Sequence, residues 1–257
     1  MAVILDKDGH VATLTIDRPE RLNALDAEHY RLLSEAWSEI RDDTRIRAAI
    51  VTGRGDRSFC AGADITSFVA AERDAAEFWL TQRDQLLNRG LEVWKPIVAA
   101  VNGHCLGAGL TLLFATDIRI ATPNATFGLP EIKRGVIASN GGTQRLLAQL
   151  PYAIAMELLL TGEPMDADTA ARWGLVNRIV PALELPAAAR RVAELLAAQA
   201  PLAVQAAKEL AIRSRDLPLA DGLRLEQALL RLLDGTQDVA EGKRAFAERR
   251  APSFEGR

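Results

Sequence analysis

Two short segments rich in glycine and alanine are the parts of this chain most suited to bind a ligand through backbone atoms. SFCAGADI (58–65) and NGHCLGAGL (102–110) each follow an apolar run. Small residues in such turns allow backbone N–H groups to point at an anion or a polarised carbonyl. One N–H from each segment would form an oxyanion hole, in which each donor contributes roughly 2.7–4 kcal/mol. Taken singly, each segment is explained more simply as a tight turn.

Glu131 is the side chain most suited to acid–base chemistry, and it stands directly after Pro130 in FGLPEIKRG. A dry pocket would have to tune its pKa before it could work near neutral pH. A dinucleotide-binding loop is excluded for the second glycine segment, because the G-x-G-x-x-G pattern needs a third glycine where this chain has Leu112.

Histidines and cysteines provide no second centre of chemistry. The three histidines show no metal-ligand spacing, so we expect His104 to be structural and His10 and His29 to lie on the surface. Cys105 has no base near it in the sequence and is expected to be a small packing residue. Cys60 and Cys105 are too few for a disulfide framework, which predicts reduced thiols.

The overall composition is that of a soluble globular protein. Of 257 residues, 49% are hydrophobic and 25% are charged, and the formal net charge is −3. Because there is no basic field, neither nucleic acid nor an anionic membrane is expected as a partner. No apolar run reaches the ~18 residues of a membrane helix, and the N-terminus lacks the features of a signal peptide. We therefore expect a cytoplasmic protein without a metal site.

Strand and helix patterns alternate along the first half of the chain. Residues 11–17 alternate as a strand, and Asp26 is placed to cap a helix over 27–41. Apolar runs at 47–53 and 97–103 indicate buried strands. This order predicts an α/β layered core in which the glycine segments come directly after strands.

Amphipathic helical patterns dominate after about residue 140 and occupy nearly all of 185–250. Faces rich in alanine and leucine usually pack on the main domain or on another subunit. The charged stretch 66–92 is also expected to be helical, and mobile.

Ordered motifs along nearly the whole chain resemble the crotonase superfamily, also called the enoyl-CoA hydratase/isomerase family. The motifs are DRPERLNALD (17–26), AIVTGRGDRSFCAGADI (49–65), KPIVAAVNGHCLGAG (95–109), FGLPEIKRGVIASNGGTQRL (127–146) and LLLTGEPMDADTAARWGLVNRIVP (158–181). The resemblance implies a crotonase-like spiral of repeated ββα units over residues 1–195. It also implies a C-terminal helical segment over 196–257 for packing and oligomerisation, in a homotrimer or a dimer of trimers.

The resemblance also implies an acyl-CoA thioester substrate, so that coenzyme A enters as part of the substrate and no separate cofactor is expected. By motif position, the thioester oxygen would lie between the backbone N–H groups of Ala63 and Ala108. The family often has glycine at the second position, but alanine supplies the same donor. Coenzyme A contacts are implied for the loop with Ala61, Asp64 and Ile65, and for Arg21 near the phosphates.

The hydratases of this family carry two glutamates, and this chain matches only one of those positions. Glu131 stands at the Pro-Glu position, whereas the other glutamate is replaced by Thr111. Ser139 stands where other branches use an aspartate and is followed by Asn140, and we expect these two and Thr111 to position water or substrate. Asp117 is expected to be structural. Loss of a general base typically removes about 10²- to 10⁴-fold of rate, so efficient hydration of the usual kind is not expected.

A single glutamate suits double-bond isomerisation or a related proton transfer at the α-carbon, because one carboxylate can remove and return the same proton while an oxyanion hole holds the enolate. This is the function that the residues favour. One alternative is a 2-enoyl-CoA hydratase that uses Glu131 alone. An alternative of another class is a homologue that binds acyl-CoA without catalysis, because fold alone never determines activity. The length and structure of the acyl group are left open.

Overall fold

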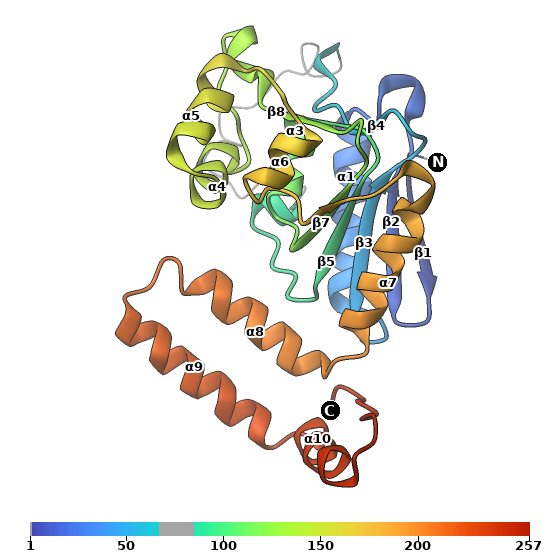
Figure 1. Cartoon of the computed structure of the whole chain (residues 1–257), viewed down its shortest axis with the longest axis vertical. Helices are drawn as coiled ribbons and strands as arrows, with labels where there is room; N and C mark the ends of the chain where they lie inside the picture. Colours follow the sequence, from blue (N-terminus) through green and yellow to red (C-terminus); the bar gives the residue numbers. More distant parts are fainter. Residues whose placement is uncertain (1, 67–84) are drawn as a thin grey trace.

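The computed structural model describes residues 2–66 and 85–257, and it contains two sheets that lie against each other (Figure 1). The larger sheet has the strand order β1-β2-β3-β5-β7-β10, in which β1 and β2 are antiparallel and the other neighbours are parallel. Its strands are β1 (Val3–Asp8), β2 (Val11–Ile16), β3 (Ala48–Gly53), β5 (Ile97–Val101), β7 (Ile118–Ala121) and β10 (Arg178–Ile179).

The smaller sheet has the order β4-β6-β8-β9, and its first three strands are parallel. Its strands are β4 (Ser58–Cys60), β6 (His104–Leu106), β8 (Thr126–Gly128) and β9 (Met165–Asp166). Along the chain, β3, β5 and β7 of the large sheet are each followed by a strand of the small sheet. This repetition confirms the predicted α/β spiral.

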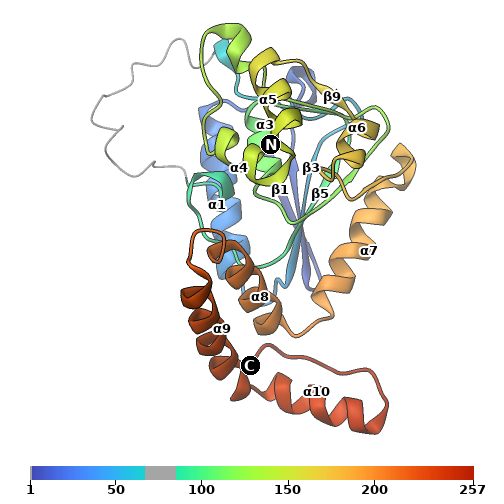
Figure 2. The ribbon, with the colours of Figure 1, turned by 60° about the vertical axis from the view of Figure 1, so that its left-hand side comes forward.

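Helices cover both faces of the large sheet, as Figure 2 shows for α1 and α7. Helix α1 (Ala27–Asp42) begins at Asp26, whose carboxylate accepts a hydrogen bond from the N–H of His29, so the predicted cap is confirmed. Helix α7 (Leu185–Ala197) packs on the opposite face. Because strand side chains alternate, Leu14 of β2 faces the α1 side and Val11 faces the α7 side.

Short helices gather around the small sheet. They are α3 (Ala108–Leu113), α4 (Gly142–Gln149), α5 (Tyr152–Thr161) and α6 (Ala167–Arg172), with 3₁₀ turns η1 (Pro19–Arg21), η3 (Leu87–Arg89), η4 (Pro130–Arg134) and η5 (Ala182–Glu184). In the described parts of the chain, no helix combines the length and apolar character needed to cross a membrane. The prediction of a mobile helix within 66–92 falls largely on residues 67–84, which lie outside the described residues.

The last helices, α8 (Pro201–Arg213), α9 (Leu219–Asp234) and α10 (Gln237–Glu248), extend away from the sheets (Figure 1). The predicted boundary at residue 195 falls inside α7, which ends at Ala197. Lys208 ties α8 to the core, because its ammonium group donates to Asp117 Oδ2 over 2.7 Å. The same oxygen accepts from the N–H of Ile97, which confirms the predicted structural role of Asp117.

Candidate active site

The two glycine segments meet at Gly62 and Gly107. Gly62 has φ +108°, and a Cβ added to it would lie 3.3 Å from the carbonyl oxygen of Leu106 and 3.7 Å from the nitrogen of Ala108. Gly107 has φ +53° and ψ −118°, a conformation that favours glycine and turns the chain from β6 into α3. The segments predicted from the sequence therefore lie in contact, and both need glycine where they meet.

The backbone N–H groups of Ala63 and Ala108 point away from the backbone hydrogen bonds that hold their own segments in place. Leu25 donates to the carbonyl of Gly62 and accepts from the N–H of Asp64, both over 2.8 Å. Because N–H directions alternate along an extended chain, the N–H of Ala63 points away from Leu25. Ala108 is the first residue of α3 and has no acceptor within the helix. In the described part of the chain, neither N–H donates to a backbone carbonyl.

Glu131 lies beside this pair of donors. A Cβ added to Gly107 would come within 3.2 Å of Glu131 Oε1, so the carboxylate contacts the turn that precedes Ala108. Among the described residues, Glu131 Oε2 is buried and has no hydrogen-bond partner. Burial raises the pKa of Glu131 above its ordinary value, against smaller opposing effects of its own N–H and of Arg134. A buried carboxylate with an unused oxygen is suited to exchange a proton with a ligand.

Thr111, which stands in place of the second glutamate, uses its hydroxyl group within the protein. The side chain is 1% exposed, and its Oγ1 donates to the carbonyl of Ala108 over 3.0 Å. Asn88 donates to the same oxygen from Nδ2 over 2.9 Å. No motif in the sequence marks Asn88, which reaches the site only because η3 packs against α3.

Two arginines surround Asn140 next to these residues. Arg89 donates from Nε to Asn140 Oδ1 over 3.0 Å and lies 4.1 Å from the centre of the Tyr30 ring. Arg145 donates to the carbonyls of Asn140 and Asn88 over 3.0 and 3.2 Å. Burial raises the pKa of Tyr30 to about 12, although Arg89 opposes this shift. This wall of the site is polar.

Ser139 and Asn140 differ in how the structure uses them. Ser139 is exposed, and its carbonyl accepts a hydrogen bond from the N–H of Gly142 over 3.0 Å. Asn140 has φ +55° and its side chain is held by Arg89. The roles predicted for them in positioning water or substrate stay predictions.

The predicted coenzyme A residues come from η1 and from the loop that carries Ala63. Arg21 is exposed, and Ile65 is 49% exposed. The N–H of Ala61 donates to the carbonyl of Leu22 over 3.0 Å, and that of Asp64 is bonded to Leu25. Contacts of Ala61 or Asp64 with coenzyme A therefore require other atoms of these residues and stay predictions.

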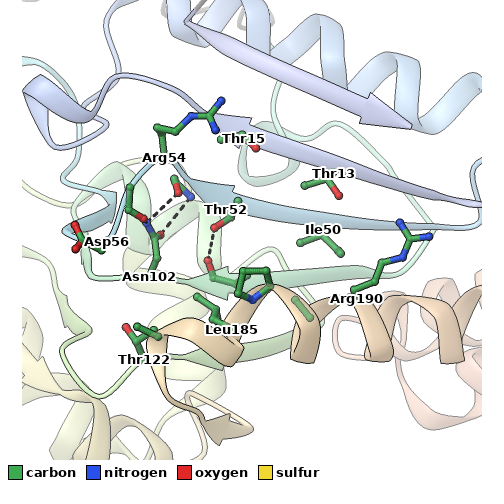
Figure 3. A pocket seen from close by; sticks show the side chains of 16 residues that line it. Thr13, Thr15, Ile50, Thr52, Arg54, Asp56, Asn102, Thr122, Leu185 and Arg190 are labelled. Carbon is green, nitrogen blue, oxygen red and sulfur yellow. Dashed lines mark hydrogen bonds between the residues drawn. The ribbon is translucent and has the colours of Figure 1, made fainter. Parts of the chain in front are cut away.

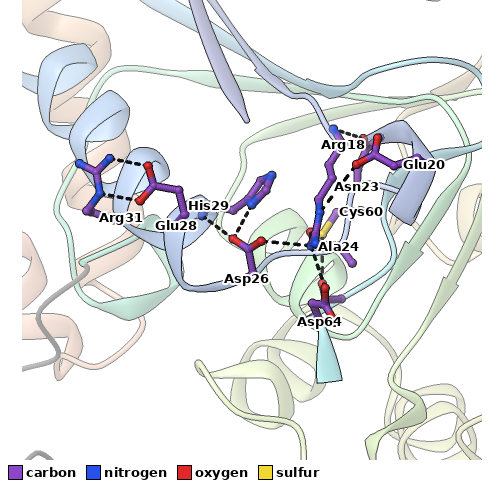
Figure 4. A network of polar contacts seen from close by, with 11 residues as sticks. Arg18, Glu20, Asn23, Ala24, Asp26, Glu28, His29, Arg31, Cys60 and Asp64 are labelled. Atoms are coloured by element: carbon purple, nitrogen blue, oxygen red, sulfur yellow. Dashed lines mark hydrogen bonds and ion pairs between the residues drawn. The ribbon is translucent and has the colours of Figure 1, made fainter. Parts of the chain in front are cut away.

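An ion-pair network fixes this loop to the start of α1. Arg18 lies between Asp64 and Asp26, with N–O distances of 2.9 and 3.3 Å (Figure 4). A hydrogen bond from the hydroxyl of Thr66 and the contact with Arg18 lower the pKa of Asp64. The carboxylate of Asp64 thus serves to hold the loop in place.

The prediction that His29 lies on the surface is wrong, because this residue is 3% exposed. It precedes Leu33 by four residues and so belongs to the buried stripe of α1. Its ring is held by the capping carboxylate, at 2.6 Å between Nδ1 and Asp26 Oδ1. His10 is exposed, as predicted. His104 is bonded to Thr126, at 2.8 Å between Nδ1 and Oγ1, which agrees with its predicted structural role.

Both cysteines are buried free thiols. Burial raises the pKa of Cys60 to about 12, and it raises the pKa of Cys105 well above its ordinary value. Because the thiolate is the reactive form, these side chains are packing residues, as predicted for Cys105.

A cavity of about 290 Å³ lies elsewhere, between the large sheet and the first turns of α7 (Figure 3). Thr13, Thr15 and Thr52 face Leu185 across it. Asn102, the first residue of the second glycine segment, lines this cavity. Because Glu131, Ala63 and Ala108 do not, the cavity is separate from the site described above.

Replacing Gly109 with alanine is expected to destabilise the protein by about 1–3 kcal/mol, since overpacking a core has costs of this size. A Cβ on Gly109 would lie 2.3 Å from the carbonyl oxygen of Cys60, where β4 crosses α3. Urea unfolding measures the change. Gly235→Ala is the matched control, because no atom lies within 4 Å of the added Cβ. Equal unfolding free energies for the two variants would contradict this packing.

The spiral of ββα units, with two N–H donors beside a buried carboxylate, defines an enzyme of the crotonase fold. Comparison with known proteins agrees, because the family model for enoyl-CoA hydratase/isomerase matches residues 6–257. The chain therefore belongs to the enoyl-CoA hydratase/isomerase family, whose enzymes act on acyl-CoA thioesters.

Two curated relatives are similar over nearly their whole lengths. The chain is 43% identical to (E)-benzylidenesuccinyl-CoA hydratase of Thauera aromatica, with 100% of both chains covered. It is 39% identical to carnitinyl-CoA dehydratase of Proteus mirabilis (strain HI4320), with 97% of this chain and 96% of the relative covered. Among solved structures, a putative enoyl-CoA hydratase/isomerase from Mycobacterium abscessus is 41% identical, with a TM-score of 0.90 and complete coverage of both chains.

Proposed function

We propose that the protein catalyses reversible hydration of a 2-enoyl-CoA thioester, with Glu131 as the acid–base residue. The N–H groups of Ala63 and Ala108 hold the thioester oxygen. The observation that carries this proposal is the buried Glu131 carboxylate, with one unused oxygen, against the turn that leads into Ala108. The names of the two curated relatives, a hydratase and a dehydratase, support the addition and removal of water.

One carboxylate is sufficient for the proton balance of this reaction. The oxygen of water forms a bond to the β-carbon, while the Glu131 carboxylate takes one proton from that water. The electrons of the C=C bond move into the thioester, and the enolate oxygen is held by the two N–H donors. Glu131 then returns the proton to the α-carbon, so that H and OH have been added and the enzyme is unchanged.

Double-bond isomerisation, which the sequence favoured, is the second candidate. It is supported by the replacement of the second glutamate by Thr111. The polar pair of Asn88 and Thr111 favours hydration instead, because a buried polar wall suits water better than an acyl chain.

Separate assays of crotonyl-CoA and of a 3-enoyl-CoA distinguish these functions. We expect kcat/KM for hydration to exceed that for isomerisation at least about tenfold, which corresponds to about 1.4 kcal/mol in transition-state stabilisation. The opposite preference would establish isomerisation. Tight binding of both thioesters, and of cinnamoyl-CoA, without turnover of any of them would identify a non-catalytic acyl-CoA-binding homologue.

For the assembly, we expect a homotrimer or a dimer of trimers in the cytoplasm. Several leucines are exposed on α9, including Leu219 at 79% and Leu232 at 74%, and apolar surface of this kind marks protein contacts. Light scattering on the purified protein measures the number of subunits.

A further inference from the structure

The geometry points to Asn88 as a residue that binds the water added to the double bond, through its side-chain oxygen Oδ1. This inference rests on the proposed hydration function and adds a second group that contacts the water. Asn88 lies in η3, and 23 positions in the sequence separate this residue from Thr111.

The hydrogen bonds of Thr111 determine which end of the Asn88 amide faces it. Thr111 Oγ1 gives its one proton to the carbonyl of Ala108. It can therefore only accept from Asn88, so the amide nitrogen Nδ2 must face Thr111. The oxygen Oδ1 consequently points away from Thr111.

Asn88 Oδ1 is a buried acceptor with nothing to accept from. The side chain is 5% exposed, and among the described residues Oδ1 has no hydrogen-bond partner. Such groups are rare in folded proteins because they lose their bonds to water on folding, and each one requires an explanation. Glu131 Oε2 is in the same state. Among the described residues, the two oxygens without partners therefore belong to side chains at opposite ends of the segment Gly107–Thr111. Glu131 contacts Gly107, and Asn88 contacts Thr111.

In the arrangement that we propose, one water molecule uses both oxygens. It donates one hydrogen to Asn88 Oδ1 and the other to the Glu131 carboxylate, which leaves an oxygen lone pair for the β-carbon. When the C–O bond forms, the hydrogen on Glu131 is transferred and the hydrogen on Asn88 stays with the new hydroxyl group. Asn88 is neutral throughout and takes no proton. It replaces the positioning effect of a second glutamate but not its basicity.

The role predicted for Thr111 in positioning water or substrate stays a prediction. Because its hydroxyl donates to the carbonyl of Ala108 and accepts from Asn88 Nδ2, it also acts in this proposal as a positioning residue that orients the Asn88 amide.

Two reactions of the same enzyme distinguish a role of Asn88 in binding water from a role in holding the site together. Hydration of crotonyl-CoA needs water at the β-carbon. Exchange of an α-hydrogen of butyryl-CoA in D2O needs Glu131 and the oxyanion hole but no such water. We expect Asn88→Leu to lower kcat for hydration by about 10- to 100-fold, a typical effect of removing a buried hydrogen bond. The rate of α-hydrogen exchange is expected to change by less than about threefold. Mass spectrometry of the thioester measures the exchange.

Asn88→Asp keeps an oxygen in the same place and is expected to retain more hydration than Asn88→Leu. Unchanged hydration in Asn88→Leu would overturn the inference, and so would an equal loss of hydration and exchange. If Thr111→Val lowered the rate of hydration and Asn88→Leu did not, the water would be assigned to Thr111 and the inference would also be overturned. If the wild-type enzyme hydrates none of the thioesters while it exchanges the α-hydrogen, the proposed function has failed instead.

Discussion

Glu131→Gln is expected to lower kcat/KM for 2-enoyl-CoA hydration by about 10³-fold, within the 10²- to 10⁴-fold range that one general acid–base residue contributes. The amide has the same shape but can neither take a proton from water nor give one to the α-carbon. The α-hydrogen exchange of butyryl-CoA is expected to fall by a similar factor, because it needs the same carboxylate. Steady-state kinetics and exchange measure both effects, and a variant with intact rates would refute the assignment.

The pH dependence of the wild-type enzyme provides an independent check. Hydration begins with an ionised Glu131, so kcat/KM is expected to fall as the pH drops through the pKa of this group. Burial raises that pKa above its ordinary value of 4.5. The loss of activity is therefore expected at a higher pH than an exposed glutamate would give. An acid limb at or below pH 4.5 would contradict the burial of this carboxylate.

The same shift predicts that Glu131→Gln is more stable than the wild type at neutral pH. A carboxyl whose pKa is higher in the folded than in the unfolded state destabilises the fold once the pH exceeds both values. Removing the charge removes this cost, so Tm should rise at pH 7 and the difference should vanish below the unfolded pKa. A raised Tm together with lost activity would show that the variant is folded.

Ala108→Pro is expected to lower kcat by about 10²- to 10³-fold, the effect of losing one oxyanion-hole donor. Ala108 is the first residue of α3, where proline is well tolerated and where the N–H makes no helical hydrogen bond. Gly107 has no Cβ to collide with the proline ring. The substitution therefore removes the donor and little else, and steady-state kinetics with crotonyl-CoA measures the result.

Ala108→Gly is the matched control, because it keeps the N–H and removes only a methyl group. We expect its kcat to stay within about threefold of the wild type, well below the 10²-fold expected for a lost donor. Comparable losses in both variants would mean that the side chain of Ala108, and not its N–H, is important. A proline variant with unchanged kcat would exclude this N–H from the oxyanion hole.

The strands of the large sheet were largely predictable, because each buried strand leaves a local pattern. Val11–Ile16 alternates, and Ala48–Gly53 and Ile97–Val101 are continuous apolar runs. The small sheet was not recognised from the residue pattern. Its strands β4 and β6 have three residues each, too few to show a period, and the sequence indicated only turns there.

The sequence by itself determined the family, the pairing of the two glycine segments and the position of one glutamate. These properties depend on residue types that have few alternatives, such as glycine at a positive φ. Only the tertiary structure decided that His29 is buried, that the Thr111 hydroxyl donates to Ala108 and accepts from Asn88, and that Asn88 lies at the site. The physical reason is that burial and hydrogen-bond partners depend on contacts between distant segments, and no local pattern records which acceptor is left without a donor.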